Sequence, residues 1–324
     1  MQRFGRLIGV SVALALALPL AAPATAGSLY EVPKYAAILL NSDTGEVLYA
    51  RKADEQRFPA SITKVMSIYV AFEEMKAGRL KDSDRITISK YAAGQPPTKL
   101  GLKPGQTISV NDAIGVMATR SANDISVALA EHIAGSEGAF AARMTATARR
   151  LGMMNSQFRN PHGLPNAQHF TTARDIAMLS RALVRDFPDR YFVFSKVEHQ
   201  YEGQMIASHN HLLKTVPGVD GIKTGFTNAA GFTLAASAAH DGVRLIAVVL
   251  GGPNRMMRDG NVSELLETGF QVLTRRSRGE ATTVAANFAE PDDLSDAVME
   301  RLAGEAPASD GLVLNTGTPT RLAR

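Results

Sequence analysis

The sequence of 324 residues contains no cysteine and carries little excess charge. The lack of cysteine excludes disulfide bonds and a lipid anchor attached to cysteine. A chain of this length, 45% apolar, can bury a large core without crosslinks, in one or two domains. Its formal net charge of +4 falls to +2 once Arg3 and Arg6, in a leader-like segment, are set aside. This near-neutral balance does not favour a nucleic-acid or anionic-membrane partner.

The sequence also lacks the signatures of cofactor binding. No predicted strand is followed by the glycine spacing of a phosphate-binding or dinucleotide-binding loop. His209 and His211 could share a strand face and bind a metal ion, but no further cluster of ligand residues accompanies them. Solvent-exposed or hydrogen-bonded histidines explain this pair better. We therefore expect neither a metal ion nor any other cofactor.

One long apolar run stands at the N-terminus. Arg3 and Arg6 precede the stretch LIGVSVALALALPLAA, and the small residues Ala24–Ala26 follow it. This order is typical of a secretory signal peptide that is removed after export. An uncleaved membrane anchor is the alternative, for which the stretch is short. We expect residues 1–26 to be a signal peptide and the mature protein to start near Gly27.

Predicted strands lie towards both ends of the chain, with predicted helices between them. Residues 35–55 predict a β-hairpin, because two apolar, β-branched runs flank the turn sequence NSDTG. Helical periodicity follows at 61–77 and continues in several segments to about residue 187, and strands return near residue 219. These later strands include a hairpin around Asp241 and Gly242, and a closing helix is predicted from residue 261 to residue 276. These patterns predict an α/β (α+β) fold. One antiparallel sheet is built from both termini and flanked by helices, with a helical lobe inserted at about 79–213.

The composition changes after Gly279 to mainly Ala, Thr, Asp, Glu and Pro. One short helix could form at 293–302, but this segment is too small to bury a core of its own. It is also poor in the basic and aromatic residues of a membrane-surface helix. We expect one domain over residues 27–278 and a low-complexity, partly ordered tail over residues 279–324.

The stretch FPASITKVMS places Ser61 three residues before Lys64 at the start of a predicted helix. Residues three apart lie on the same side of a helix, so the two side chains are within reach of each other. The apolar neighbours Val65 and Ile68 place Lys64 on the core-facing side. Burial lowers the pKa of a lysine, and a neutral amine can take the proton of a serine hydroxyl and make it a nucleophile. The alternative is a lysine that extends along the apolar surface into water.

Two further stretches make this pattern more specific. RSANDIS carries Ser121 and Asn123 at the junction of two predicted helices, where they could also be ordinary capping residues. GVDGIKTGFT carries Lys223, Thr224 and Gly225 on a predicted strand, where Lys-Thr-Gly could also be a common strand end. Together and in this order, the three stretches match the Ser-x-x-Lys, Ser-x-Asn and Lys-Thr-Gly set of penicillin-binding proteins and class A β-lactamases.

Over about residues 30–276 the sequence resembles the low-molecular-weight penicillin-binding proteins, which are serine-type D-Ala-D-Ala carboxypeptidases of bacterial cell-wall metabolism (peptidase S11-like). The likeness extends to the stretches NPHGLPNAQHFTTARDIA, GVDGIKTGFTNAAGF and VVLGGPNRMMRDGNVSELLETGF. It implies a β-lactamase/transpeptidase-like fold. It also implies an exported protein in the periplasm or on the cell-wall side of the inner membrane.

The resemblance implies a catalytic role for each of the motif residues. Ser61 would be the acylated nucleophile, and Lys64 would be the base that activates it. Ser121 and Asn123 would relay protons to the leaving amine and hold the substrate amide. The oxyanion of the reaction would lie between the backbone N–H groups of Ser61 and Phe226.

The resemblance also implies the substrate-binding residues. Lys223 would supply positive charge, and Gly225 would belong to the strand that binds the substrate. Thr224 and Arg258 would receive the terminal carboxylate, for which arginine is suited because it can make a two-pronged contact. Arg255 is the nearby alternative to Arg258.

Two departures from the family pattern alter these expectations. Phe226 follows Lys-Thr-Gly where relatives often have a polar residue, so we expect an altered substrate preference. Many relatives also carry a β-rich second domain and an amphipathic membrane anchor, and the sequence ends before both. We therefore expect no strong membrane anchor after signal cleavage, and an endopeptidase gains support as an alternative.

The expected function is that of a serine D-alanyl-D-alanine carboxypeptidase. It would remove the terminal D-Ala from peptidoglycan stem peptides through an acyl-enzyme, and β-lactams would inhibit it. The first alternative is a D,D-endopeptidase that cuts peptidoglycan crosslinks with the same residues. A β-lactamase is less favoured, because the Glu-x-x-Leu-Asn element of class A enzymes is not recognisable. The last alternative is a non-catalytic module that binds peptidoglycan or β-lactams.

Overall fold

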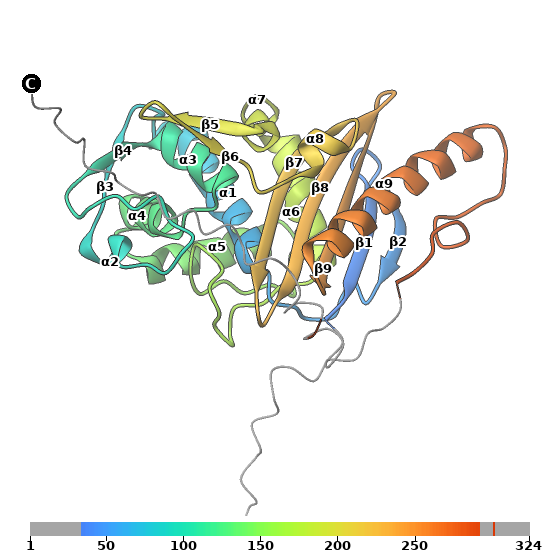
Figure 1. The fold of residues 1–324 in the computed structure, drawn as a ribbon, viewed down its shortest axis with the longest axis horizontal. Helices are drawn as coiled ribbons and strands as arrows, with labels where there is room; N and C mark the ends of the chain where they lie inside the picture. The colour runs from blue at the N-terminus through green and yellow to red at the C-terminus, as the bar shows by residue number, and fades with distance from the viewer. Residues whose placement is uncertain (1–33, 292–300, 302–324) are drawn as a thin grey trace, which may run out of the picture.

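A computed structural model describes residues 34–291 and residue 301. Its main feature is a five-stranded antiparallel sheet beside a helical lobe (Figure 1). The strands lie in the order β2-β1-β9-β8-β7, so segments from both ends of the described chain share one sheet, which confirms the predicted α/β architecture. The strands are β1 (Ala36–Asn41), β2 (Val47–Arg51), β7 (Val219–Thr227), β8 (Gly231–His240) and β9 (Val243–Gly252).

Turn residues set two hairpins of this sheet. Between β1 and β2, Asn41 Oδ1 accepts hydrogen bonds from the backbone N–H groups of Asp43 and Thr44 at 2.9 and 3.1 Å. Between β8 and β9, Asp241 and Gly242 both have positive φ, as a two-residue hairpin turn of type I′ requires. Both turns lie where the sequence predicts them, because short polar residues and glycine adopt these conformations at low cost.

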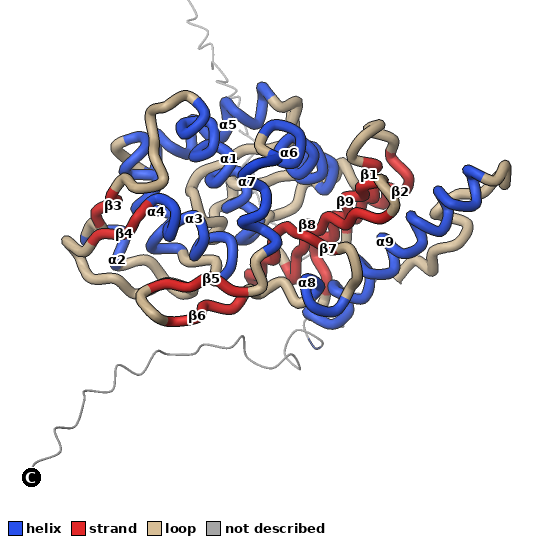
Figure 2. The backbone as a smooth tube through the Cα atoms, turned by 90° about the horizontal axis from the view of Figure 1, so that it is seen from above, coloured by secondary structure: helices blue, strands red, loops and turns tan. Residues whose placement is uncertain are grey.

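Helices lie on both sides of the sheet (Figure 2), and both of its faces are buried. Alternate residues of β1 belong to different core clusters, as the two-residue period of a strand requires. Ile38 and Leu40 pack in the cluster that includes helices α1 (Thr63–Lys76) and α6 (Ala173–Asp186), whereas Leu39 packs in the cluster that includes helix α9 (Arg255–Ser277). The sheet therefore has a layer of helices on either side.

The helical lobe lies between β2 and β7 in the sequence and beside the β7 edge of the sheet in space (Figure 1). Side-chain hydroxyls of Ser109, Ser136 and Thr172 cap three of its longer helices. Besides α1 and α6, the helices between β2 and β7 in the sequence are α2 (Lys90–Ala93), α3 (Val110–Thr119), α4 (Asn123–Ala134), α5 (Glu137–Arg150), α7 (Pro188–Tyr191) and α8 (Leu212–Thr215). The short strands are β3 (Arg85–Thr87), β4 (Thr107–Ser109), β5 (Glu198–Tyr201) and β6 (Gln204–Ala207), and a 3₁₀ turn covers Phe192–Ser195.

Two helix starts differ from the predicted positions. Ser61 lies in a 3₁₀ turn, η1 (Ala60–Ile62), which precedes α1, because the Ile62 N–H bonds back only three residues to the Pro59 carbonyl. The closing helix, predicted from residue 261, begins six residues earlier. Asn254 caps it there, because its Oδ1 accepts a hydrogen bond from the Met257 N–H at 2.8 Å.

After α9, residues 279–291 return towards β2. Phe288 packs edge to face on Tyr49 with ring centroids 5.2 Å apart, and the Tyr49 hydroxyl donates to Glu290 at 2.7 Å. The predicted signal peptide and the remainder of the tail lie outside the described residues. Among the described residues, no helix combines the length and apolar character needed to cross a membrane.

Candidate active site

Ser61 and Lys64 lie one turn apart where η1 runs into α1. Lys64 Nζ is 3.1 Å from Ser61 Oγ, as their spacing predicts. The Lys64 side chain is fully buried, and its amine also contacts Asn123 Oδ1 at 2.7 Å and the His162 carbonyl oxygen at 2.8 Å. Three oxygens from three separate segments therefore surround one buried amine.

The surroundings of Lys64 favour its uncharged form. Burial lowers the pKa of Lys64 well below its ordinary value, and the positive charge of Lys223 lowers this pKa further. A neutral amine has two N–H donors and one lone pair. The carbonyl oxygens of Asn123 and His162 can accept the two donors, which leaves the lone pair for the hydroxyl proton of Ser61. The arrangement can thus turn this serine into a nucleophile.

Ser121 and Asn123 come from the junction of α3 and α4. Ser121 has φ +68°, a left-handed conformation uncommon for residues other than glycine. Its buried Oγ has no hydrogen-bond partner within residues 34–291. Asn123 is held from the loop after α2, because its Nδ2 donates to the Pro96 carbonyl at 3.0 Å and its backbone N–H donates to the Thr98 carbonyl at 2.8 Å. A substrate could therefore bond the Ser121 hydroxyl without breaking an existing contact.

The edge strand β7 brings Lys-Thr-Gly to the serine. Lys223 and Thr224 are both buried. Burial, together with the positive charge of Arg258, lowers the pKa of Lys223 to about 7. Gly225 allows the strand to approach closely, because a Cβ at this position would lie 2.8 Å from the backbone nitrogen of Ser61. Backbone N–H groups of β7 and η1 can thus converge on one oxyanion.

The two candidate arginines lie in different surroundings. Arg258 is 2% exposed, donates to the Thr233 carbonyl at 3.0 Å and pairs with Asp259 at 2.7 Å. Thr233 lies directly opposite the glycine of Lys-Thr-Gly in the β7–β8 register, and the charge of Arg258 acts on Lys223. Arg255 is exposed. The structure therefore places Arg258 against the motif strand, with Asp259 as an ionic partner that sequence reasoning did not foresee.

A loop over 160–164 is a part of the site to which the sequence analysis assigned no role. Gly163 has φ +89°, and a Cβ there would lie 1.8 Å from the Ala60 carbonyl oxygen. Asn160 Oδ1 closes the loop by accepting a hydrogen bond from the Gly163 N–H at 2.7 Å. The loop thereby presents the His162 carbonyl to the buried amine. The signal for this turn is the spacing of asparagine and glycine within NPHGL.

The histidine pair in SHNHLL has cationic neighbours. His209 lies near the site, and burial, with the charges of Lys223 and Arg120, lowers its pKa to about 4. His211 instead contacts Arg255 at 3.4 Å. In the part of the chain that the structure describes, no group of three or more His, Cys, Asp or Glu side chains could hold a metal ion. Positive neighbours oppose the binding of a cation at this pair.

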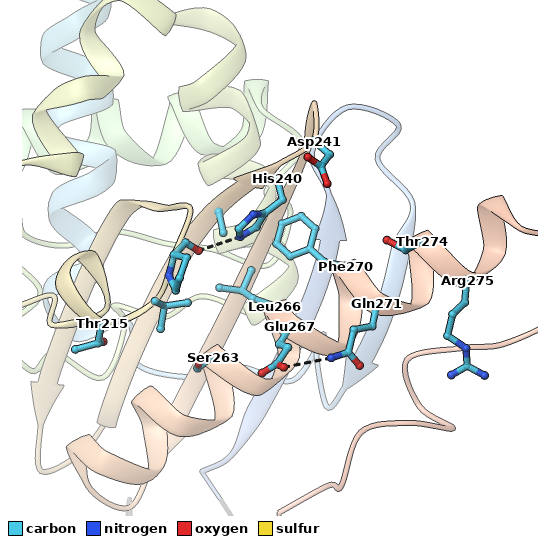
Figure 3. A pocket seen from close by; sticks show the side chains of 13 residues that line it. Thr215, His240, Asp241, Ser263, Leu266, Glu267, Phe270, Gln271, Thr274 and Arg275 are labelled. Atoms are coloured by element: carbon cyan, nitrogen blue, oxygen red, sulfur yellow. Dashed lines mark hydrogen bonds between the residues drawn. The ribbon is translucent and has the colours of Figure 1, made fainter.

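A groove of about 760 Å³ lies elsewhere, between α8, the end of β8 and α9 (Figure 3). His240, Glu267 and Phe270 line it, and the His240 ring packs edge to face on Phe270 at 4.7 Å. None of its lining residues surrounds Ser61, so the chemistry of the serine does not use this groove.

The buried lysines make the stability of the protein depend on pH. The pKa of Lys223 is about 7 in the folded protein and 10.5 when unperturbed, so between these values the unfolded chain binds more protons. The free energy of unfolding should therefore rise from about pH 7 to about pH 9.5, by at most about 1.4 kcal/mol per pH unit for this group. Urea unfolding of the wild type and of Lys223→Met at both pH values measures the effect. The methionine variant should show the smaller rise, and equal rises would contradict the assignment.

These features define a class of mixed α/β proteins in which a buried Ser-x-x-Lys pair faces an edge strand that carries Lys-Thr-Gly. A family model of the D-alanyl-D-alanine carboxypeptidases, peptidase S11, matches residues 23–254. The chain belongs to this family.

Named relatives and solved structures agree with this family. The chain is 39% identical over 241 residues to the D-alanyl-D-alanine carboxypeptidase DacA of Escherichia coli (strain K12), which covers 72% of this chain and 60% of that protein. It is 36% identical over 243 residues to the D-alanyl-D-alanine carboxypeptidase DacF of Bacillus subtilis, which covers 72% of this chain and 61% of that protein. The chain thus spans about three fifths of the length of these relatives.

The solved structures share the fold. Penicillin binding protein 5 of Haemophilus influenzae matches with a TM-score of 0.70 and 34% identity, over 73% of this chain and 70% of that one. Penicillin-Binding Protein D2 of Listeria monocytogenes, in its cefotaxime-bound form, matches with a TM-score of 0.67 and 30% identity, over 72% of this chain and 96% of that one. The predicted resemblance to penicillin-binding proteins is therefore confirmed.

Proposed function

We propose that the protein is a serine D-alanyl-D-alanine carboxypeptidase that removes the terminal D-Ala from peptidoglycan stem peptides and is acylated by β-lactams. The observation that carries this proposal is the buried amine of Lys64, 3.1 Å from Ser61 Oγ, in surroundings that disfavour its charge. The names of the relatives DacA and DacF support the substrate class. The cefotaxime-bound relative supports β-lactam binding.

In the acylation step, Ser61 Oγ attacks the carbonyl carbon of the penultimate D-Ala while the Lys64 amine takes its proton. The backbone N–H groups of Ser61 and Phe226 bind the oxyanion that forms. The Ser121 hydroxyl, which has no partner within residues 34–291, relays a proton to the leaving nitrogen as its bond to carbon breaks. Asn123 holds the substrate amide beside the reacting carbonyl.

Deacylation reverses these proton transfers. Water attacks the ester carbon and gives a proton to Lys64, and the oxygen of Ser61 leaves and regains a proton. Substrate recognition depends on positive charge, because the substrate ends in a free carboxylate. Lys223 and Arg258 supply this charge, and Thr224 donates its hydroxyl to the carboxylate.

Phe226 gives the substrate site an apolar border. Its side chain is 42% exposed at the end of β7, and its ring lies on that of Phe232 with centroids 4.2 Å apart. Because only the N–H of Phe226 is needed for the oxyanion, the ring is free to alter which substrates bind well. Gly225 next to it keeps the strand close to the serine.

The cell-wall substrate and the leader-like N-terminus together support an exported protein that works in the periplasm, or on the cell-wall side of the inner membrane. Residues 27–278 form its catalytic domain, with the helical lobe at about 79–213, and residues 279–324 form the tail. A nucleic-acid partner does not belong to this proposal, because the charge of the chain is close to neutral.

The proposal is tested with the wild-type protein, three substrates and penicillin as a covalent label. A pentapeptide stem ending in D-Ala-D-Ala should release free D-Ala, and penicillin should add its mass to the peptide that contains Ser61. Cleavage of crosslinked muropeptides without release of D-Ala from the stem would assign an endopeptidase instead. Rapid repeated turnover of nitrocefin would assign a β-lactamase. If the protein formed no penicillin adduct and turned over none of the substrates, a non-catalytic binding module would be the remaining assignment.

A further inference from the structure

Glu137, at the start of α5, contacts the 160–164 loop, which binds the Lys64 amine, and α2, whose following loop holds Asn123. Its Oε1 is 3.1 Å from Nε2 of His162, whose carbonyl oxygen binds the amine. Its Oε2 accepts a hydrogen bond from the Tyr91 hydroxyl at 2.5 Å. Tyr91 lies on α2, the helix that precedes Pro96. One carboxylate therefore connects α2, α5 and the 160–164 loop behind the base.

The hydrogen bonds around His162 define its tautomer. The Leu164 backbone N–H donates to Nδ1 at 3.1 Å, so Nδ1 is an acceptor and the proton lies on Nε2, which donates to Glu137. Burial lowers the pKa of His162, although its bond to Glu137 opposes this effect. The neutral ring is thus held at both nitrogens. Because ring and carbonyl belong to one residue, fixing the ring restricts where the carbonyl oxygen can point.

The second arm from Glu137 reaches the base through Asn123. The Tyr91 hydroxyl ties α2 to Glu137, and the loop that follows α2 supplies the Pro96 carbonyl that accepts from Asn123 Nδ2. Asn123 Oδ1 is in turn an acceptor of the Lys64 amine. The two acceptors that orient this amine are therefore supported from behind by the same carboxylate.

We propose that Glu137 is a positioning residue for Lys64. By holding His162 and the α2 segment, it fixes the two acceptors that direct the N–H groups of the amine and leave its lone pair aimed at Ser61. This inference deepens the proposed function and rests on it, because it takes Lys64 as the base. A base displaced by about 1 Å can slow a reaction by about 100-fold. Loss of Glu137 should therefore slow acylation without removing a group that touches the substrate.

The helical lobe contains a second carboxylate–histidine pair that serves as a matched control. Asp112 Oδ1 is 3.3 Å from His199 Nε2, and Asp112 Oδ2 accepts a hydrogen bond from the Ser109 hydroxyl at 2.6 Å. Both this histidine side chain and that of His162 are 5% exposed. The Asp112 pair lies outside the set of contacts that reaches the buried amine. Asp112→Ala therefore removes a carboxylate from beside a buried histidine of the same lobe and leaves the contacts of the base in place.

The experiment measures the second-order rate constant for acylation by a fluorescent penicillin, over about pH 6 to pH 10. Glu137→Ala should slow acylation by about 10- to 100-fold and alter the pH profile. Glu137→Gln should recover most of the rate, because its amide oxygen still accepts from His162 Nε2–H and its NH₂ can donate to the tyrosine oxygen. Asp112→Ala should keep the wild-type rate and profile. Thermal unfolding establishes that each variant is folded.

The pH profile separates positioning from a general loss of stability. The charged groups that face Lys64 are Lys223 of β7 and Asp124 of α4, and the neutral imidazoles of His162 and His209 lie nearby. None of these four residues is replaced in the variants. Glu137→Ala and Glu137→Gln both remove the charge of Glu137, but only the glutamine variant can keep the hydrogen bonds to His162 and Tyr91. A profile that shifts further in Glu137→Ala than in Glu137→Gln therefore reports altered hydrogen bonding at the amine, which partial unfolding would not produce.

Each outcome decides the inference. Equal rates and profiles for the wild type and Glu137→Ala overturn it, and so does an equal loss in Asp112→Ala. If Glu137→Ala does not fold, Tyr91→Phe is the substitute, because it removes the hydroxyl that donates to Glu137 from a side chain that is more than half exposed. It should give a smaller loss of the same kind. Failure of the wild type to form an adduct at Ser61 overturns the proposed function as well, and the two failures are thus distinguishable.

Discussion

Replacement of Ser61 by alanine is expected to abolish both D-Ala release and covalent labelling by penicillin. The substitution removes the oxygen that lies 3.1 Å from the Lys64 amine and leaves the other site residues in place. The fall in kcat should be at least about 10⁴-fold, as for removal of the nucleophile from other serine hydrolases. Release of D-Ala from a pentapeptide stem and gel fluorescence with labelled penicillin measure the two effects.

Ser180→Ala is a matched control for this substitution. Ser180 is also buried, but its Oγ donates to the Ile176 carbonyl within α6, away from the site. This variant should keep wild-type rates. Release of D-Ala by the Ser61→Ala protein would contradict the assignment and would require another nucleophile. Ser121 would be the first candidate, because its hydroxyl has no partner among the described residues.

Replacement of Lys64 by methionine is expected to have the second-largest effect. Methionine fills a similar buried volume but offers no lone pair to the serine proton, so the acylation rate should fall by about 10²- to 10⁴-fold. Two effects on stability oppose each other. The cost of burying an amine disappears, while Asn123 Oδ1 and the His162 carbonyl lose a donor. We therefore expect a folded protein with nearly unchanged thermal stability.

The pH dependence of the remaining rate distinguishes a lost base from a lost contact. In the wild type, acylation should rise with pH as the amine of Lys64 loses its proton, and this limb should disappear in Lys64→Met. Lys223→Met should keep the limb, although its position should shift towards higher pH because a positive neighbour has been removed. A Lys64→Met protein with an unchanged rate and profile would show that the base lies elsewhere.

Much of the fold could be predicted from local sequence patterns. The β8–β9 turn at Asp241 and Gly242 follows from residue types that accept positive φ. Helix boundaries were harder to predict, because they depend on single capping contacts. Asn254 starts α9 six residues before its apolar periodicity becomes evident. Ser61 lies in a 3₁₀ turn because one hydrogen bond spans three residues instead of four.

In the candidate site, too, some residues could be predicted from the sequence and others could not. Ser61, Lys64 and Lys223 belong to short motifs, and such motifs can be read from residue type and spacing. The contribution of His162 could not be found this way, because it is a backbone carbonyl, which every residue type possesses. Glu137 has no motif either, since its partners stand 46 residues before it in α2 and 25 residues after it in the 160–164 loop.

By itself, the sequence determined which residues carry the chemistry and on which kinds of element they stand, because helical and strand periodicities and reactive side-chain types are local properties. Only the tertiary structure decided how the Lys64 amine is oriented. That orientation depends on carbonyl acceptors from two other segments and on Glu137 behind them. Hydrogen bonds between segments far apart in sequence form only when the chain packs, so the direction of one lone pair is a property of the whole fold.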